Sequence, residues 1–324
     1  MCTALNLNTN DHYFGRNLDL DRSYEEEVCI VPRNYTLNFR CKDKLTKHFA
    51  FIGMATIVEN VPLFYDGTNE YGVSAAGLNF PDNAYYPPTK KDKDNITSFE
   101  FIPWILAKCK SVNEAKTLLN NINICNIPFS DKLPVSPLHW IISDRCSSIV
   151  VESMSDGLHI YDDFAGVLTN NPPLPYQLFN LNNYRNLKTD NGKNTLDENM
   201  PLYTYCSGLG SMGLPGDVSS MSRFVRITFK KANSVCKGDE LSSVSQFFHL
   251  LSSVEVSRGS CITDNDTLNI TVYSSCVNTD KGRYYYTTYD NRQINCVDMH
   301  CTDLEGNKVS RFPLILQQNI NYQN

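Results

Sequence analysis

A two-residue alternation of apolar and polar side chains runs through the first eighty residues of this chain. Successive side chains of a β-strand point to opposite faces, so this period predicts strands with one buried face. Turn clusters such as Asn8–Asp11 and Asp66–Asn69 separate them. The expected strands are Cys2–Leu7, Tyr13–Asp19, Val28–Pro32, Phe49–Glu59, Leu63–Asp66 and Gly72–Phe80. This part of the chain is therefore predicted to be a sheet.

The period changes after a polar segment, Tyr85–Asn95, which is predicted to be an exposed loop. Ser111 and Glu114 have the spacing of a capping box at a helix start. The expected helices are Ser98–Lys108, Ser111–Asn121, Tyr176–Leu187, Ser220–Ser234 and Val244–Ser253. The later strands are expected at Leu138–Ser143, Ser148–Ser153, Leu158–Asp162, Leu268–Ser275, Arg283–Thr288 and Ile294–Met299. Strands and helices occur in blocks, which favours one α+β domain over residues 1–324 with antiparallel sheets.

Charge and composition exclude several classes of protein. The chain has 29 Lys and Arg against 35 Asp and Glu, a net charge of −6, so no nucleic-acid partner is expected. No apolar run approaches the roughly 20 residues that a membrane-spanning helix needs. The chain starts without the basic and apolar regions of a secretory signal. We therefore expect a cytoplasmic protein, and we expect its 12 cysteines to be reduced and mostly buried.

Patterns that could indicate a cofactor, a metal or a catalytic histidine are incomplete. Gly208–Gly213 has the glycine spacing of a dinucleotide-binding loop, but Leu214–Gly216 would break the helix that must follow. Asp19 and Asp21 share one face of a strand, yet no further residues complete a ligand set. His139 lies in an apolar strand and is expected in the core. The sequence therefore predicts neither cofactor nor metal.

Cys2 could become the first residue of the mature chain. A small second residue permits removal of Met1, and Cys2 would then carry both a thiol and its own α-amine. The ordinary pKa values are about 7.7–8.0 for the amine and about 8.5 for the thiol. The amine can therefore act as general base for the thiol without a histidine. Many chains have a small second residue for reasons of translation or processing, so the position of Cys2 alone does not indicate catalysis.

Six separated parts of the chain carry a resemblance to a known family. They are Cys2–Ala4 with Phe14–Asp19, Ala76–Pro81, Ser136–Trp140, Val167–Pro172, Gly213–Phe224 and Tyr286–Asp290. In this order they resemble the choloylglycine hydrolase family, which contains bile salt hydrolases and penicillin V acylases, and the resemblance is closer to the former. It implies an N-terminal nucleophile hydrolase with a four-layer αββα fold and two stacked antiparallel sheets, which cleaves a linear amide.

The resemblance also implies roles for individual residues. Cys2 matches the nucleophile, and Asn79 and Asn170 match groups on the oxyanion side. The expected catalytic residues are Cys2, Arg16, Asp19, Asn170 and Arg223, and the expected substrate-binding residues are Asn79, Arg16, Leu18 and Leu20. Without the family, Arg16 and Asp19 would be taken for an ordinary ion pair. Their odd separation puts them on opposite faces of a regular strand, so a bulge or a strand end is expected there.

The implied reaction is hydrolysis of the amide bond of glycine- or taurine-conjugated bile salts, giving the free bile acid and the amino acid. Two alternatives stay open, a penicillin V acylase acting on other linear amides and a non-catalytic homologue that binds bile salts. The implied partner is thus a small molecule, and the resemblance implies a homotetramer.

Overall fold

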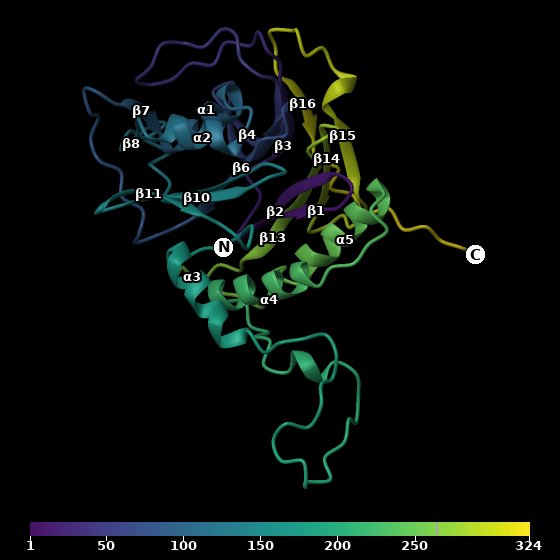
Figure 1. Ribbon diagram of the computed structural model, residues 1–324. Coiled ribbons are helices and arrows are strands. Elements are labelled where there is room, and N and C mark those ends of the chain that lie inside the picture. Colours follow the sequence, from purple (N-terminus) through teal and green to yellow (C-terminus); the bar gives the residue numbers. More distant parts are fainter. Residues whose placement is uncertain (264) are drawn as a thin grey trace.

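The computed structural model, which describes residues 1–263 and 265–324, has four layers in the order helix, sheet, sheet, helix (Figure 1). Two large antiparallel sheets face each other, and helices cover the outer face of each. The predicted α+β class and the αββα arrangement are therefore confirmed.

The first sheet contains the N-terminus, and apart from the short β12 its strands come from the two ends of the chain. Its order is β12 (Val167–Leu168), β1 (Cys2–Asn8), β2 (His12–Leu20), β13 (Ile270–Asn278), β14 (Arg283–Thr288) and β15 (Asn295–Asp298). Its outer face packs against α4 (Ser220–Ala232) and α5 (Glu240–Ser252). The helix α3 (Leu174–Asn180) contacts α4, and a long segment between these two helices projects from the body (Figure 1).

The second sheet is built mainly from the first half of the chain. Its order is β11 (Gly157–Asp162), β10 (Ser148–Met154), β9 (Leu138–Ser143), β6 (Ser74–Asn79), β5 (Val61–Asn69), β4 (Phe51–Val58), β3 (Glu27–Val31) and β16 (Ser310–Pro313). The helices α1 (Phe101–Lys108) and α2 (Val112–Leu119) cover it. Beside them, β7 (Asp94–Thr97) and β8 (Ile122–Cys125) form a small parallel sheet that the sequence did not predict.

Strand β9 shows how one strand serves two cores. Ile141 packs in the cluster between the two sheets, whereas Trp140 and Ile142 pack in the cluster under α1 and α2. Trp140 stacks on Phe101 of α1 at a centroid distance of 4.4 Å. Both faces of this strand are covered, so its run of apolar residues is continuous rather than alternating.

The turn predicted at Asp66–Asn69 is wrong, because β5 continues through Asn69. Gly67 lies opposite Gly53 of β4, and a Cβ atom there would lie 2.8 Å from the Ile52 carbonyl oxygen. Glycine at this position therefore permits close approach of two strands rather than a turn. The turn follows directly, where Gly72 donates its N–H to the Asn69 carbonyl.

The helix starts differ in detail from the prediction. Ser111 caps α2 by accepting from the Glu114 N–H at 3.2 Å, but the Glu114 carboxylate accepts from the N–H of Lys110 instead of Ser111. Only half of the predicted capping box is present. α5 begins at Glu240 rather than Val244, since Asp239 caps it through the Ser242 N–H.

The cysteines are free thiols, as expected, but most are not buried. Five are buried and four are exposed, while the other three are partly covered. The exposed ones are Cys146 and Cys206 in loops, Cys296 in the edge strand β15 and Cys301 in the 3-10 helix that follows it. No helix among the described residues is both long and apolar enough to cross a membrane.

Candidate active site

Cys2 is the first residue of β1 and lies at one end of the first sheet. It pairs with Leu18 of β2, and only 3% of it is exposed. Its backbone N–H donates to the Asn170 Oδ1 atom at 2.8 Å. Asn170 follows the short strand β12, which pairs with β1, so the sheet brings the two ends together.

Met1 continues β1 along Asp19 of the neighbouring strand. The Asp19 N–H donates to the Met1 carbonyl at 3.0 Å, and the Met1 amine donates to the Asp19 carbonyl at 2.7 Å. Met1 therefore covers the backbone polar groups of Asp19. Loss of Met1 would uncover these groups and turn the Cys2 nitrogen into an α-amine beside Asn170.

Arg16 and Asp19 lie on opposite faces of β2. Arg16 faces the second sheet, where its Nη1 atom donates to the carbonyls of Tyr65 at 2.9 Å and Gly77 at 2.6 Å. Asp19 lies on the face toward the helices, and its Oδ1 atom accepts from the Thr271 hydroxyl at 2.6 Å. Because Cys2 pairs with β2 between these residues, they flank it from its two sides.

The prediction of a bulge or strand end between Arg16 and Asp19 is wrong, because β2 runs through both residues and the irregularity lies in the neighbouring strand β13. β2 pairs with β1 without interruption, whereas its register with β13 shifts between Thr271 and Tyr273, opposite Asp19 and Leu18. An extra residue in one strand of a pair bends it locally and changes where its side chains point. Here the shift places Thr271 opposite Asp19.

The side chains of Arg16 and Asp19 each keep a buried polar atom without a hydrogen-bond partner among the described residues. These atoms are Nη2 of Arg16 and Oδ2 of Asp19. Burial acts to lower the pKa of Arg16, but the negative charges of Cys2, Tyr273, Asp66 and Asp19 raise it overall. Burial raises the pKa of Asp19, against the attraction of Arg223 and the terminal amine.

Asn170 connects Cys2 to two other elements. Its Oδ1 atom accepts from the Cys2 N–H and from Nη2 of Arg223 at 2.7 Å. Its Nδ2 atom donates to the carbonyl oxygen of Asn79, also at 2.7 Å. Both side-chain polar atoms of Asn170 therefore form hydrogen bonds. Its NH2 group has two hydrogens, so one of them is still able to donate to another acceptor.

Arg223 comes from α4 and is wholly buried beneath the start of β1. Its Nη1 atom donates to the Cys2 carbonyl at 2.5 Å and to the Thr3 hydroxyl at 2.6 Å. Burial lowers the pKa of this guanidinium, while Asp19 and Cys2 act to raise it. The helix thus places a cation behind the nucleophile candidate.

Asn79 contributes through its backbone, while its side chain is exposed at the end of β6. The next residue, Phe80, donates its N–H to Pro137 beside β9. In an antiparallel ladder the N–H and C=O of one residue point to the same side, and adjacent residues point to opposite sides. The N–H of Asn79 therefore points away from β9, toward the side where its carbonyl meets Asn170.

Leu18 and Leu20 are placed differently. Leu18 is 3% exposed, belongs to the core between the sheets and lies opposite Cys2. Leu20 ends β2 and is only partly buried. Their role as substrate-binding residues stays a prediction.

Sequence reasoning missed the residues that hold the candidate site in place. Thr271 binds Asp19, and the Ser220 hydroxyl accepts from the Asn170 N–H at 2.9 Å. Ser220 lies inside the segment Gly213–Phe224, so the resemblance offered a signal for it. Thr271 offered none, because the register between β2 and β13 cannot be read from the chain.

Comparison with known proteins identifies the family. Residues 2–312 match the family model described as linear amide C–N hydrolases, choloylglycine hydrolase family. The chain is 50% identical over 314 residues to a bile salt hydrolase/transferase from Lactiplantibacillus plantarum, covering 97% of each. It is 39% identical over 331 residues to a bile salt hydrolase/transferase from Clostridium perfringens, covering 100% of each.

Solved structures agree with this result. A mutant of the conjugated bile acid hydrolase from Clostridium perfringens superposes with a TM-score of 0.93 at 39% identity, covering 100% of both chains. A penicillin V acylase from Agrobacterium tumefaciens has a TM-score of 0.77 at 19% identity, covering 96% of this chain and 90% of that chain, which shows a shared fold. The chain therefore belongs to the choloylglycine hydrolase family, and it is a linear amide C–N hydrolase.

Proposed function

We propose that this enzyme hydrolyses glycine- or taurine-conjugated bile salts, with Cys2 as nucleophile after removal of Met1. The observation that carries the proposal is the surroundings of the Cys2 nitrogen. It lies 2.8 Å from Asn170 Oδ1, and the nearby Asp19 carboxylate keeps one buried oxygen without a partner among the described residues. An α-ammonium group would satisfy that oxygen. The names of the relatives from Lactiplantibacillus and Clostridium support the bile-salt substrate.

The reaction begins when the α-amine of Cys2 accepts the thiol proton. The thiolate attacks the amide carbonyl carbon, and the carbonyl oxygen becomes an oxyanion. The free Nδ2 hydrogen of Asn170 and the N–H of Asn79 stabilise this oxyanion, an effect of about 3–4 kcal/mol per donor. The geometry described above supports this pairing, since both donors face the same side of β6.

The second half of the reaction returns the enzyme to its starting state. The ammonium gives its proton to the nitrogen of glycine or taurine as the C–N bond breaks, which leaves the bile acid as a thioester on Cys2. The amine then takes a proton from water, and the hydroxide formed attacks the thioester. The C–S bond breaks, and the thiolate is protonated again.

The charged residues have different roles in this proposal. Asp19 orients the α-amine and stabilises its charged form, because a carboxylate is a strong acceptor for an ammonium group. Arg16 stabilises the thiolate, and its unpartnered Nη2 atom can bind a polar group of the substrate. Arg223 fixes the Cys2 carbonyl and Asn170 Oδ1. Leu18 and Leu20 provide apolar contact for the steroid.

A hydrolysis assay on matched substrates tests the proposal. The wild-type enzyme should release glycine or taurine from conjugated bile salts faster than it cleaves a phenoxyacetyl amide. Cys2→Ala should abolish turnover. Cys276→Ala is the matched control, since Cys276 is also buried in the first sheet but lies toward its opposite end.

Two outcomes would contradict the proposal. Faster cleavage of the phenoxyacetyl amide would make the enzyme a penicillin V acylase. Equilibrium binding of bile salts without turnover by protein that begins at Cys2 would make it a non-catalytic homologue.

The homotetramer and the cytoplasmic location are part of the same proposal. The segment between α3 and α4 carries exposed apolar side chains, which suits contact with other copies of the chain. They include Leu196, Met200, Leu202, Tyr203, Tyr205 and Met212. Sedimentation equilibrium should give four times the chain mass of 36.8 kDa, whereas a single chain mass would contradict the tetramer.

A further inference from the structure

His139 contacts the residues next to both proposed oxyanion donors in the chain, Thr169 and Phe80. It is wholly buried in β9. Its Nε2 atom lies 3.0 Å from the carbonyl oxygen of Thr169, and its Nδ1 atom lies 3.1 Å from Glu152 Oε1. Thr169 directly precedes Asn170 in the chain.

The peptide group that joins Thr169 to Asn170 is held at both ends. His139 binds its oxygen, and the Ser220 hydroxyl accepts from its N–H at 2.9 Å. A planar peptide bound on both sides can rotate very little. The backbone that carries the Asn170 amide is therefore fixed by one side chain from β9 and one from α4.

The same imidazole also supports the other donor. Its ring stacks on Phe80, with the centroids 4.2 Å apart and the planes 8° apart. Phe80 directly follows Asn79, whose N–H is the second proposed oxyanion donor. His139 therefore contacts the chain neighbours of both donors.

The partners of His139 determine how its protons are placed. The Thr169 carbonyl can only accept, so the Nε2 atom must carry a hydrogen. Glu152 Oε1, which lies 3.1 Å from Nδ1, also accepts from the Leu174 N–H at 3.1 Å, so one carboxyl oxygen contacts both the ring and the start of α3. The Glu152 Oε2 atom has no hydrogen-bond partner among the described residues.

We propose that His139, oriented by Glu152, is a positioning residue that holds the Asn170 and Asn79 donors at the oxyanion. This inference rests on the proposed function, in which these two groups bind the oxyanion. It predicts that His139 affects the chemical step and not substrate affinity, because its partners Thr169, Phe80 and Glu152 are not proposed to bind substrate.

Kinetics of four variants test this inference. His139→Phe keeps the stacking on Phe80 but loses both hydrogen bonds, so kcat should fall about 10- to 100-fold while KM changes less than about threefold. His139→Gln can still donate to Thr169 and should recover part of kcat. The double variant His139→Phe with Glu152→Gln replaces the carboxyl group that His139→Phe leaves without its ring partner, and it keeps an acceptor for Leu174. It should regain the melting temperature lost in His139→Phe without regaining kcat.

His12→Phe is the matched control, since His12 is another wholly buried imidazole, at the far end of β2. It should leave kcat unchanged. The positioning role is overturned if His139→Phe retains full kcat, or if the double variant recovers kcat together with melting temperature. The variants are compared on whichever linear amide the wild type hydrolyses faster. If the wild type does not hydrolyse bile salts, the proposed substrate is refuted, but the role of His139 is still tested on the other amide.

Discussion

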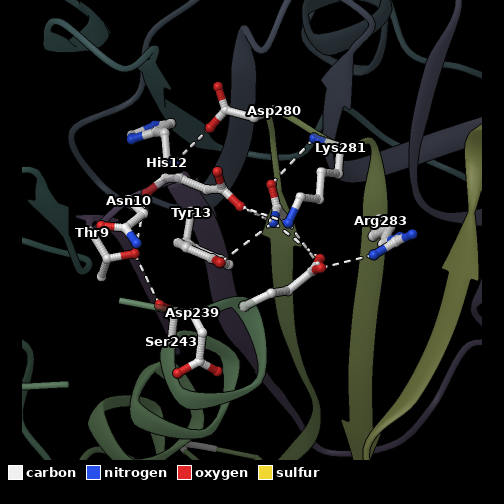
Figure 2. Close-up of polar contacts among 12 residues, drawn as sticks. Thr9, Asn10, His12, Tyr13, Asp239, Ser243, Asp280, Lys281 and Arg283 are labelled. Carbon is white, nitrogen blue, oxygen red and sulfur yellow. Dashed lines mark hydrogen bonds and ion pairs between the residues drawn. The ribbon is translucent and has the colours of Figure 1, made fainter. Parts of the chain in front are cut away.

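The two ends of the first sheet differ in how their charged groups are paired. At the end away from Cys2, Lys281, Arg283 and Tyr13 gather near the start of α5 (Figure 2). Glu240 accepts there from four side chains. These are Asn278 at 3.0 Å, Tyr285 at 2.9 Å, Lys281 at 3.1 Å and Arg283 at 2.7 Å.

The Cys2 end is built from the same strands but leaves polar atoms unused. Oδ2 of Asp19 and Nη2 of Arg16 are buried without a hydrogen-bond partner among the described residues. An unsatisfied buried group costs about 1–3 kcal/mol, and more when it is charged. Ion pairs at the Glu240 end stabilise the fold, while in the proposed mechanism the unpartnered atoms at the Cys2 end bind the mature amine and the substrate. The predictions below test this division.

The largest effect is expected from Asp19→Asn. This change keeps the size of the side chain but removes the charge that would hold the α-ammonium, so kcat should fall about 1,000-fold. Stability should change little or increase, because a buried charge is lost. A steady-state assay together with thermal unfolding measures both. Retention of more than a tenth of wild-type kcat would contradict the role given to Asp19.

Asn170→Ala should lower kcat about 100- to 1,000-fold, since it removes one oxyanion donor. It also removes the acceptor for the Cys2 nitrogen and for Arg223. The exposed Asn199, in the projecting segment, is a control, and Asn199→Ala should be fully active. If Asn170→Ala changes KM alone, the residue binds substrate and is not an oxyanion donor.

Glu240→Gln should affect stability and leave catalysis alone. The carboxylate is only 13% exposed, so loss of its ion pairs and charged hydrogen bonds should lower the free energy of unfolding by about 2 kcal/mol. The side-chain NH2 group introduced by this change also faces Lys281 or Arg283, which are donors themselves and cannot accept from it. Urea denaturation measures the change. A fall in kcat at a temperature where the variant is fully folded would show that the two ends are coupled.

The smallest effect concerns pH and His12, whose backbone N–H donates to Asp280 (Figure 2). Burial lowers the pKa of His12 to about 4 from its ordinary 6.5. The unfolded chain then binds the proton first, so stability is full above pH 6.5 and is lost as the pH falls toward 4. Between pH 7 and pH 5 the loss should be at most about 2 kcal/mol.

Phenylalanine at position 12 cannot take up this proton. The free energy of unfolding of His12→Phe should therefore fall less between pH 7 and pH 5 than that of the wild type. Equal losses in both proteins would show that other groups cause the acid sensitivity.

Much of the fold could be predicted because apolar residues recur at clear strand and helix spacings along the chain. The strands near Cys2, the helices α1 and α4 and the four layers follow from alternation, helical spacing and the resemblance. The continuation of β5 through Asp66–Asn69 could not be predicted, because the glycine and asparagine there, which are typical of turns, serve strand packing and a helix end. Whether a cysteine is exposed depends on which segments lie at the surface of the folded chain. The pattern of neighbouring residues in the sequence does not determine this.

The candidate site was predicted as a set of residues but not as a geometry. The sequence placed Arg16 and Asp19 on opposite faces of a strand and predicted an irregularity in β2 itself. The structure keeps β2 regular against β1 and uses both of its faces. Asn79 acts through its backbone, which no side-chain pattern could indicate. His139 was expected in the core, and its burial is confirmed, but its contact with Thr169 depends on tertiary packing.

The central claim is that Cys2 forms the acyl-enzyme while its own α-amine is free. Mass spectrometry of the N-terminal peptide, after rapid acid quenching during turnover of a conjugated bile salt, tests it most directly. We expect a peptide that begins at Cys2 and carries the bile acyl group on sulfur as a hydroxylamine-sensitive thioester. A fully active enzyme that retains Met1, or an acyl group found on another residue, would contradict it.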